Sequence, residues 1–184
     1  MRGADGDPHQ VRLEQARIAE LGGRGKTPMN VAPATLEVAP NRDLFVPFEF
    51  PVAELDPGWY RLELDVAVDG APATIRPGDR FAIPWPRGAT RRDQVDVGRS
   101  IRAAAGEVRV ERIECASDSI RVAYEGTEVS VSLAADGSKV PVLESTFDPD
   151  SGTGAVTAYP VLKTQRRLTV TVKGGGDPIE VDLP

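Results

Sequence analysis

The sequence predicts an all-β protein: two small β-sandwich modules behind a short N-terminal helical arm. Three observations predict this fold class. Apolar and polar residues alternate between Tyr60 and Val68, which is typical of a half-buried strand. Further along, short strand-like runs are separated by turn residues roughly every 8–12 positions, the spacing of a sandwich. No helical period is found after residue 23.

The composition is that of a folded globule with many turns. The chain has 184 residues, of which 40% are hydrophobic and 27% charged, so it can bury a proper core. It contains 18 glycines and 16 prolines, as many short strands joined by turns require. Its 22 basic and 28 acidic residues give a net charge of −6, which disfavours nonspecific binding to nucleic acid or an anionic membrane.

Few residues are suited to catalysis or to metal binding. Cys115 is the single cysteine and His9 the single histidine, so an intrachain disulfide, a His-based triad in the core and a His-rich metal site are all excluded. No nucleophile stands in a recognisable relation to a base. We therefore expect a protein that is not an enzyme and that needs no cofactor.

The N-terminus lacks the apolar stretch of a signal peptide, and no run approaches the ~18 apolar residues of a membrane span. These features predict a cytoplasmic protein without a membrane span. If the chain is a piece of a larger protein, an extracytoplasmic location is the alternative.

Residues 1–32 differ from the rest of the chain and are expected to form an N-terminal arm. Asp7-Pro8 resembles a helix start, and Val11, Ile18 and Leu21 give a modest helical stripe. This pattern predicts a short helix over about residues 8–21, ended by Gly22-Gly23. The Gly-rich run that follows is not a phosphate-binding loop, because that motif requires glycine where Glu20 stands. A linker is the better interpretation.

Residues 33–90 are expected to form the first module. Pro57-Gly58 marks a turn, the strand 58–68 follows it, and Asp69-Gly70 closes it with a tight turn. Pro47 places the apolar run 44–50 at a sheet edge or a bulge. The remaining strands of this module are expected at 35–38, 73–75 and 80–86.

Residues 98–184 are expected to form the second module, after a turn-rich boundary between Gly88 and Gly98. Alternation over 107–115 slips by one residue near Arg112, which predicts a β-bulge. Asp136-Gly137 is a further hairpin turn. The strands of this module are expected at 100–103, 107–115, 119–124, 129–133, 140–143, 154–159, 168–172 and 179–183.

These patterns resemble those of immunoglobulin-like and fibronectin type III sandwiches. The run from Leu55 through Pro57-Gly58 to Tyr60 looks like a tyrosine corner, in which the tyrosine hydroxyl bonds back to the corner backbone. Residues 99–184 are similar to small modules of bacterial extracytoplasmic and anti-sigma-type proteins. The resemblance implies two Ig-like modules, but the disulfide and core tryptophan of antibody domains are absent, and a fold alone implies no function.

Two segments are candidate binding sites. Phe81 and Trp85, followed by Arg87, Arg91 and Arg92, combine aromatic and arginine side chains, the composition enriched in interface hot spots. Asp148 and Asp150 lie in a Gly-rich loop, 148–154, that could offer oxygens to Ca²⁺. For each segment the alternative is structural: a proline-rich edge in which Trp85 covers one end of the core, and a long hairpin turn.

The favoured function is a non-enzymatic protein-binding or assembly module, which recognises a protein partner or a second copy through a sandwich edge or the Trp85–Arg92 region. The alternative is a ligand- or carbohydrate-binding sandwich, with calcium assisting at the 148–154 loop. Aromatic residues make up only 5% of the chain, so a platform of exposed aromatics for sugars is poorly supported.

Overall fold

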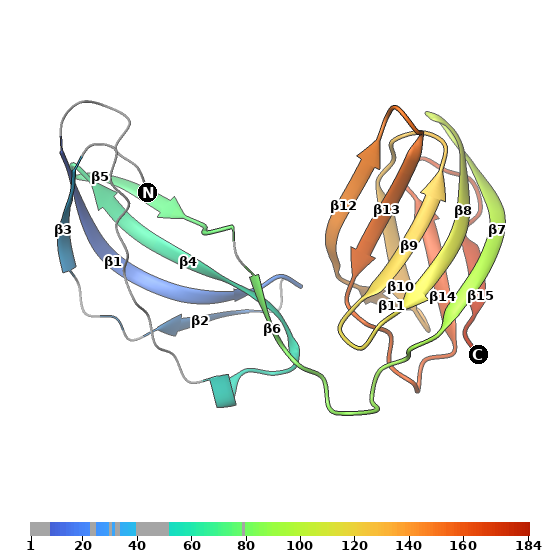
Figure 1. Ribbon diagram of the computed structural model, residues 1–184, viewed down its shortest axis with the longest axis horizontal. Helices are drawn as coiled ribbons and strands as arrows, with labels where there is room; N and C mark the ends of the chain where they lie inside the picture. Colours follow the sequence, from blue (N-terminus) through green and yellow to red (C-terminus); the bar gives the residue numbers. More distant parts are fainter. Residues whose placement is uncertain (1–7, 23–24, 30, 32–33, 40–51, 79) are drawn as a thin grey trace. The chain divides into compact units, whose positions relative to one another are not determined.

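The computed structural model describes residues 8–22, 25–29, 31, 34–39, 52–78 and 80–184. The chain divides into two compact units, unit 1 up to Ile83 and unit 2 from Pro84 onward. Every extended element among the described residues is a β-strand paired antiparallel, and the one helical element is a single 3₁₀ turn, η1 (Val52–Glu54). The expected all-β class is confirmed (Figure 1).

Unit 1 is built on a central pair of long strands. β1 (His9–Glu20) pairs with β4 (Gly58–Val68) along nearly its whole length. β2 (Lys26–Met29) and β3 (Ala34–Val38) pair with β1, while β5 (Ala71–Ile75) and β6 (Arg80–Ile83) pair with β4 (Figure 1). The described strands of this unit form one sheet, so the prediction of a two-sheet module over 33–90 stays a prediction.

The predicted N-terminal helix over residues 8–21 is wrong, because these residues form β1. A bulge between Leu13 and Gln15 explains the misleading pattern. It adds one residue, so the buried side chains of one face fall at Val11, Leu13, Ala16 and Ile18, with a three-residue step in the middle of a two-residue period. That uneven spacing imitates a helical stripe. The N-terminal segment is therefore an integral part of the sheet.

One face of this sheet carries an apolar cluster. Val11, Leu13, Val38 and Val66 are its buried members, and four partly buried hydrophobics pack against them: Val31, Leu64, Val68 and Ile75. The strand predicted for residues 58–68 is confirmed by β4. Asp69 and Gly70 both have positive φ, 49° and 84°, as a tight hairpin turn requires. The predicted strand at 44–50 lies outside the described residues.

Tyr60 makes the contact expected of a tyrosine corner. Its hydroxyl donates to the backbone carbonyl of Asp56 at 2.8 Å, across the Pro57-Gly58 turn. Its ring is buried and stacks on Phe81 of β6, with ring centroids 5.7 Å apart. The corner therefore fixes the point at which the chain enters β4.

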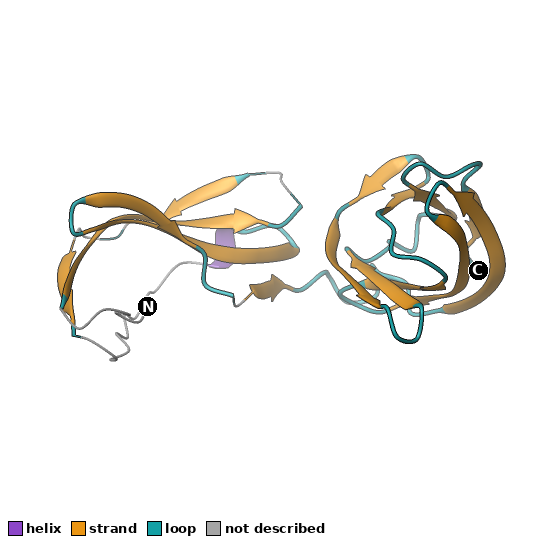
Figure 2. Cartoon of the chain, turned by 90° about the horizontal axis from the view of Figure 1, so that it is seen from above, coloured by secondary structure: helices purple, strands orange, loops and turns teal. Residues whose placement is uncertain are grey.

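Unit 2 consists of two antiparallel sheets whose strands surround a common interior (Figure 2). The first sheet has the strand order β12-β13-β9-β8-β7 and the second the order β11-β10-β14-β15. The first sheet is made of β7 (Gln94–Ala103), β8 (Gly106–Cys115), β9 (Ile120–Glu125), β12 (Val142–Asp148) and β13 (Thr153–Ala158). The second is made of β10 (Val131–Ala135), β11 (Ser138–Val140), β14 (Arg167–Val172) and β15 (Ile179–Asp182).

Alternate side chains from both sheets fill the core of unit 2. Ile113, Ile120, Val156 and Leu168 are completely buried, and Cys115 is buried as expected of a free cysteine. The bulge predicted near Arg112 is confirmed by a register shift between Val110 and Arg112.

Two glycine-containing segments of unit 2 that were expected to be rich in turns differ in structure. The Asp136-Gly137 turn is confirmed, with φ of 46° and 79°. The segment between Gly88 and Gly98 was expected to be a boundary, but from Gln94 onward it forms strand β7. Gly98, with φ of 59°, lies at a register shift within this strand.

Gly154 lies at a tightly packed point of the first sheet of unit 2. A Cβ atom there would collide with the ring of Tyr124, which is itself stacked on Phe147 at 6.4 Å. We expect Gly154→Ala to lower the free energy of unfolding of unit 2 by about 1–3 kcal/mol, the usual penalty of overpacking. Calorimetry checks this. Gly176→Ala, where a Cβ meets only ordinary contact, is the matched control, and an equal loss in both variants would contradict the packing argument.

Candidate functional site

Trp85 lies on unit 2 and is only half buried. Its ring meets Tyr159 edge-on, with ring centroids 5.6 Å apart, and Tyr159 is itself buried. Backbone hydrogen bonds hold the segment in place: the amide of Arg91 donates to Val161 at 2.9 Å, and the amide of Lys163 donates to Ala89 at 2.9 Å. The tryptophan is therefore fixed on its buried side while part of it stays accessible.

The three predicted arginines of this segment separate into two groups. Arg87 and Arg92 are exposed. Arg91 is only 3% exposed and donates to the Gln165 carbonyl at 2.8 and 3.0 Å, to the carboxylate of Asp93 and to the carbonyl of Pro184. Because its donors are used in this way, Arg91 ties the last residues of the chain to the strand ends and is not on the surface.

Phe81 does not join this group within one unit. It lies on β6 of unit 1, where it stacks on Tyr60, whereas Trp85 and the three arginines belong to unit 2. Within unit 2 the surface residues of the predicted set are thus Trp85, Arg87 and Arg92. We call these three residues the Trp85 surface.

Asp148 and Asp150 lie at the hairpin turn between β12 and β13. One carboxylate oxygen of Asp148 accepts the amide of Asp150 at 3.0 Å, and the other accepts the hydroxyl of Ser151 at 2.8 Å. The hydrogen bond from Ser151 is the main cause that lowers the pKa of Asp148. Among the described residues no group of three or more His, Cys, Asp or Glu side chains could hold a metal ion, so the calcium site stays a prediction.

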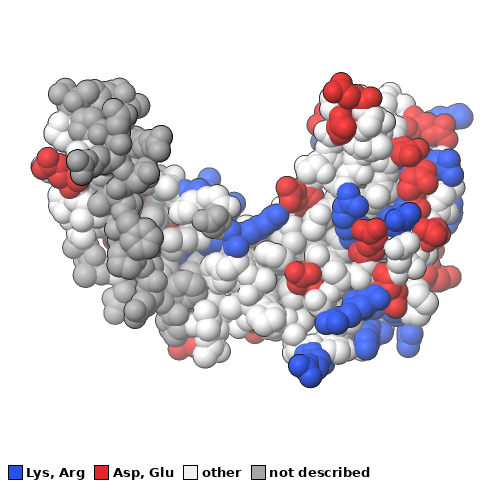
Figure 3. Space-filling view, viewed as in Figure 1, with Lys and Arg blue, Asp and Glu red and all other residues white. Residues whose placement is uncertain are grey.

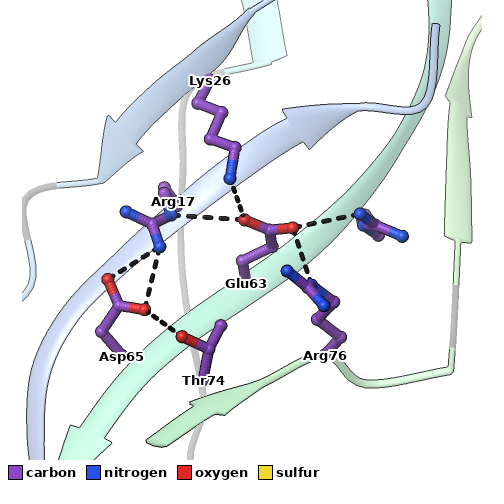
Figure 4. Close-up of polar contacts among 7 residues, drawn as sticks. Arg17, Lys26, Glu63, Asp65, Thr74 and Arg76 are labelled. Carbon is purple, nitrogen blue, oxygen red and sulfur yellow. Dashed lines mark hydrogen bonds and ion pairs between the residues drawn. The ribbon is translucent and has the colours of Figure 1, made fainter. Parts of the chain in front are cut away.

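A cluster that the sequence did not reveal surrounds Glu63 on β4. Its side chain is buried, yet its carboxylate meets four cations from four places in the chain (Figure 4). Oε2 accepts from Lys26 Nζ at 2.7 Å and from Arg17 Nε at 3.3 Å. Oε1 accepts from Arg61 and Arg76, each at 3.1 Å. We call these five residues the Glu63 cluster.

Asp65 extends the cluster along the same strand. Its carboxylate accepts a hydrogen bond from Arg17 Nη2 at 2.9 Å and another from the hydroxyl of Thr74 at 2.9 Å (Figure 4). Arg17 therefore bridges two carboxylates. Near the start of β4, the guanidinium of Arg80 lies 5.6 Å from the ring centroid of Trp59.

The surrounding cations make Glu63 a strong acid despite its burial. Hydrogen bonding to Lys26 is the largest cause, burial opposes it, and hydrogen bonds from Arg76 and Arg17 add to it, so that the pKa falls from 4.5 to about 2. The alternation between Tyr60 and Val68 predicts only that Glu63 and Asp65 lie on the polar face of a half-buried strand. The alternation of Arg61, Glu63 and Asp65 on a long strand was the only local signal, because the other cations are distant in sequence.

The two units present different charge patterns. On unit 2, acidic and basic side chains are interspersed over the visible face (Figure 3), in keeping with pairs such as Arg121–Glu114 and Arg112–Asp96. On unit 1 the cations instead gather around Glu63.

Removing the negative charge at the centre of the Glu63 cluster tests its contribution to stability. We expect Glu63→Gln to destabilise unit 1 by about 3 kcal/mol at neutral pH, since four cations lose their shared partner and a buried polar group remains. Denaturant unfolding measures the change. Glu37→Gln, on exposed β3 surface, removes the same charge as a control, and an equally small effect of both variants would contradict the prediction.

The same carboxylate sets a pH dependence with a definite sign. Because the folded pKa is about 2 and the ordinary value is 4.5, the stabilisation from Glu63 is complete above about pH 5 and is lost as the pH falls toward 2. The difference in unfolding free energy between wild type and Glu63→Gln should therefore shrink steadily over that range. A difference that stays constant from pH 7 to the acid limit would show that ionisation of Glu63 is not its source.

Calcium binding at the 148–154 loop has a direct test. Since both carboxylate oxygens of Asp148 already accept hydrogen bonds within the turn, we expect the melting temperature to be the same in Ca²⁺ and in a chelator, for wild type and for Asp148→Ala/Asp150→Ala alike. A rise in Ca²⁺ that occurs in the wild type and disappears in the double variant would instead establish the metal site.

No protein-family model matches the chain, and no curated protein is similar to it in sequence. Within the described ranges no helix is long and apolar enough to cross a membrane. The function of the chain is therefore inferred from its own strand order, packing and charges.

Proposed function

We propose that this chain is a non-enzymatic binding or assembly module that recognises another protein through unit 2. The observation that supports this most is the state of Trp85: a large aromatic side chain that Tyr159 holds edge-on and that is only half buried. Aromatic and arginine side chains dominate binding energy at protein interfaces because they offer a large contact area at a low entropy cost.

The surroundings of Trp85 suit a protein partner. Pro84 and Pro86 on either side are exposed, as are Arg87 and Arg92. Leu162, which forms a β-bridge with Thr90 of the same segment, is one of three large hydrophobics exposed among the described residues. An apolar centre with cationic neighbours is the usual composition of a binding patch.

The strand order of unit 2 supports an immunoglobulin-like fold for this module. If β8 is strand A, then β8-β9-β13-β12 has the order A-B-E-D, and β10-β14-β15 has the order C-F-G. β11 then takes the place of C′ beside C, and β7 is an additional strand beside A. Such sandwiches serve many functions, so the fold supports a binding module without identifying its partner.

The edge strand β12 is the second candidate contact. It forms one end of the five-stranded sheet, and Val142 at its start is 37% exposed. An extended segment of a partner could pair with such an edge through backbone hydrogen bonds. Glu144 and the register shift between Val142 and Glu144 are features that commonly limit unwanted pairing at sheet edges.

Comparing Trp85→Ala/Arg87→Ala with the wild type tests the Trp85 surface. We expect the variant to stay folded and to bind its partner, or a second copy, at least about 30-fold more weakly, as loss of a hot spot worth about 2 kcal/mol implies. The partner is obtained by affinity capture from source lysate, self-association is measured by light scattering, and Kd is then determined for both proteins. Val142→Ala is the control on the β12 edge.

The outcomes separate the two contacts. Loss of binding in the Trp85 variant alone supports the Trp85 surface, and loss in Val142→Ala alone assigns binding to the β12 edge. Unchanged affinity in both variants would contradict a role for the Trp85 surface and for the exposed Val142 side chain.

A further inference from the structure

The sheet of unit 1 has one face that is apolar and one that is basic. Strand register places Arg17 opposite Glu63, Lys26 opposite Ala19, and Arg61 between Ala19 and Arg80. Residues opposite one another across an antiparallel pair point to the same side of the sheet. Arg17, Lys26, Arg61 and Arg80 therefore share the face opposite the apolar cluster, and Arg76 joins them through Glu63. We call these five cations the basic face.

The concentration of charge on this face is unusual for the unit. The first 83 residues contain 9 basic and 13 acidic side chains, 9 − 13 = −4, yet five of the nine cations lie on the basic face. Among the described residues, the ion pairs place two carboxylates among these cations, Glu63 and Asp65. Lys and Arg side chains are seen to gather on the visible part of the unit (Figure 3).

Glu63 holds these cations in place and leaves their side chains partly exposed to solvent. Its own side chain is 1% exposed, whereas those of Lys26, Arg61 and Arg76 are 51%, 40% and 57% exposed. One buried carboxylate thus fixes several cationic heads close together, and their mutual repulsion favours a second anion arriving from solvent. Because the heads are already fixed, less conformational entropy is lost on binding.

Arg61 supplies an independent indication that an acceptor is missing. Its Nη2 is bonded to Glu63, but its Nε is buried and has no hydrogen-bond partner. A buried donor without an acceptor is destabilising, so Glu63 alone does not satisfy the Arg61 side chain.

The charge pattern indicates the kind of partner. Guanidinium forks match carboxylates in two-point hydrogen bonds, which suits Asp and Glu side chains. A long polyanion such as nucleic acid would extend beyond the basic face into a unit whose sequence is −4 and a chain that is −6, and it would be repelled there. A short acidic segment would make only the favourable contacts.

We propose that the basic face of unit 1 binds a short acidic segment of a partner protein, with Glu63 acting as the positioning residue for the arginines and lysine. This surface is separate from the Trp85 surface of unit 2, and the proposal does not depend on it.

The test measures binding of a fluorescent oligoglutamate peptide to the full chain by anisotropy at low and at physiological salt. Lys26→Gln/Arg76→Gln removes two exposed cations of the basic face. Arg109→Gln/Arg121→Gln removes two cations of equal exposure, 55% and 54%, from unit 2. We expect Kd to rise about tenfold in the first variant and to stay unchanged in the second, with weaker binding at higher salt.

Further variants keep the test decisive if the first one unfolds. Lys26→Arg/Arg76→Lys retains both charges and should keep most of the affinity, and circular dichroism confirms that each protein is folded. Trp85→Ala/Arg87→Ala should bind oligoglutamate as the wild type does, so that this proposal and the one for unit 2 can fail separately.

Three results would overturn the inference. The first is no measurable binding of oligoglutamate by the folded wild type at low salt. The second is an equal loss of affinity in the basic-face variant and in the unit 2 control, which would indicate nonspecific attraction. The third is tighter binding of a single-stranded oligonucleotide of the same charge, which would assign the face to nucleic acid.

Discussion

Burial of the Glu63 carboxylate constrains the whole sheet of unit 1. An ion of this size costs several kcal/mol to remove from water unless it is paired and hydrogen-bonded. Here the compensation comes from β1, β2, β4 and the residue after β5, so the elements must assemble together for the charge to be tolerated. A slip of β4 by one residue would turn Glu63 toward Val11 and Leu13 on the apolar face of β1, which makes the wrong register strongly unfavourable.

Unit 2 also contains a buried charge, which is satisfied in a different way. Arg91 is a buried cation, and it is satisfied mainly by backbone carbonyls of Gln165 and Pro184, with one carboxylate from Asp93. Carbonyl groups near strand ends lack ladder partners and are suited to this role. The arginine thus fastens the end of the chain to the body of the sandwich, and only its neighbours Arg87 and Arg92 are left for the surface.

Sequence periodicity was most informative where each strand followed its ideal geometry. The strand Gly58–Val68, its Asp69-Gly70 turn and the bulge near Arg112 all follow from local alternation and turn chemistry. β1 was missed because the bulge at Leu13/Gln15 breaks the two-residue period in the very segment that would have revealed it. In a strand, one inserted residue is enough to make the apolar pattern resemble a helix.

The candidate sites were harder to predict for a different reason. Trp85 was identified from composition, but whether Arg91 was exposed depended on the chain end, 93 residues away. The Glu63 cluster depends on partners 13, 37 and 46 residues distant, which only the paired strands bring together. Local patterns locate residues on a face of a strand, but they do not determine what covers that face.

A buried carboxylate surrounded by four cations is better explained by recognition than by stability. In several proteins, replacing a buried ion pair by apolar side chains of similar volume leaves stability unchanged or raises it, so a carboxylate with four cations is a poor device for stability alone. An apolar residue at position 63 would leave Arg17, Lys26, Arg61 and Arg76 without a common centre. The free-energy cost of burying this carboxylate is understandable only if the cations themselves are needed at those positions. We therefore infer that the carboxylate serves the basic face, and that the electrostatics of unit 1 and the aromatic packing of unit 2 provide two different means of recognition within one chain.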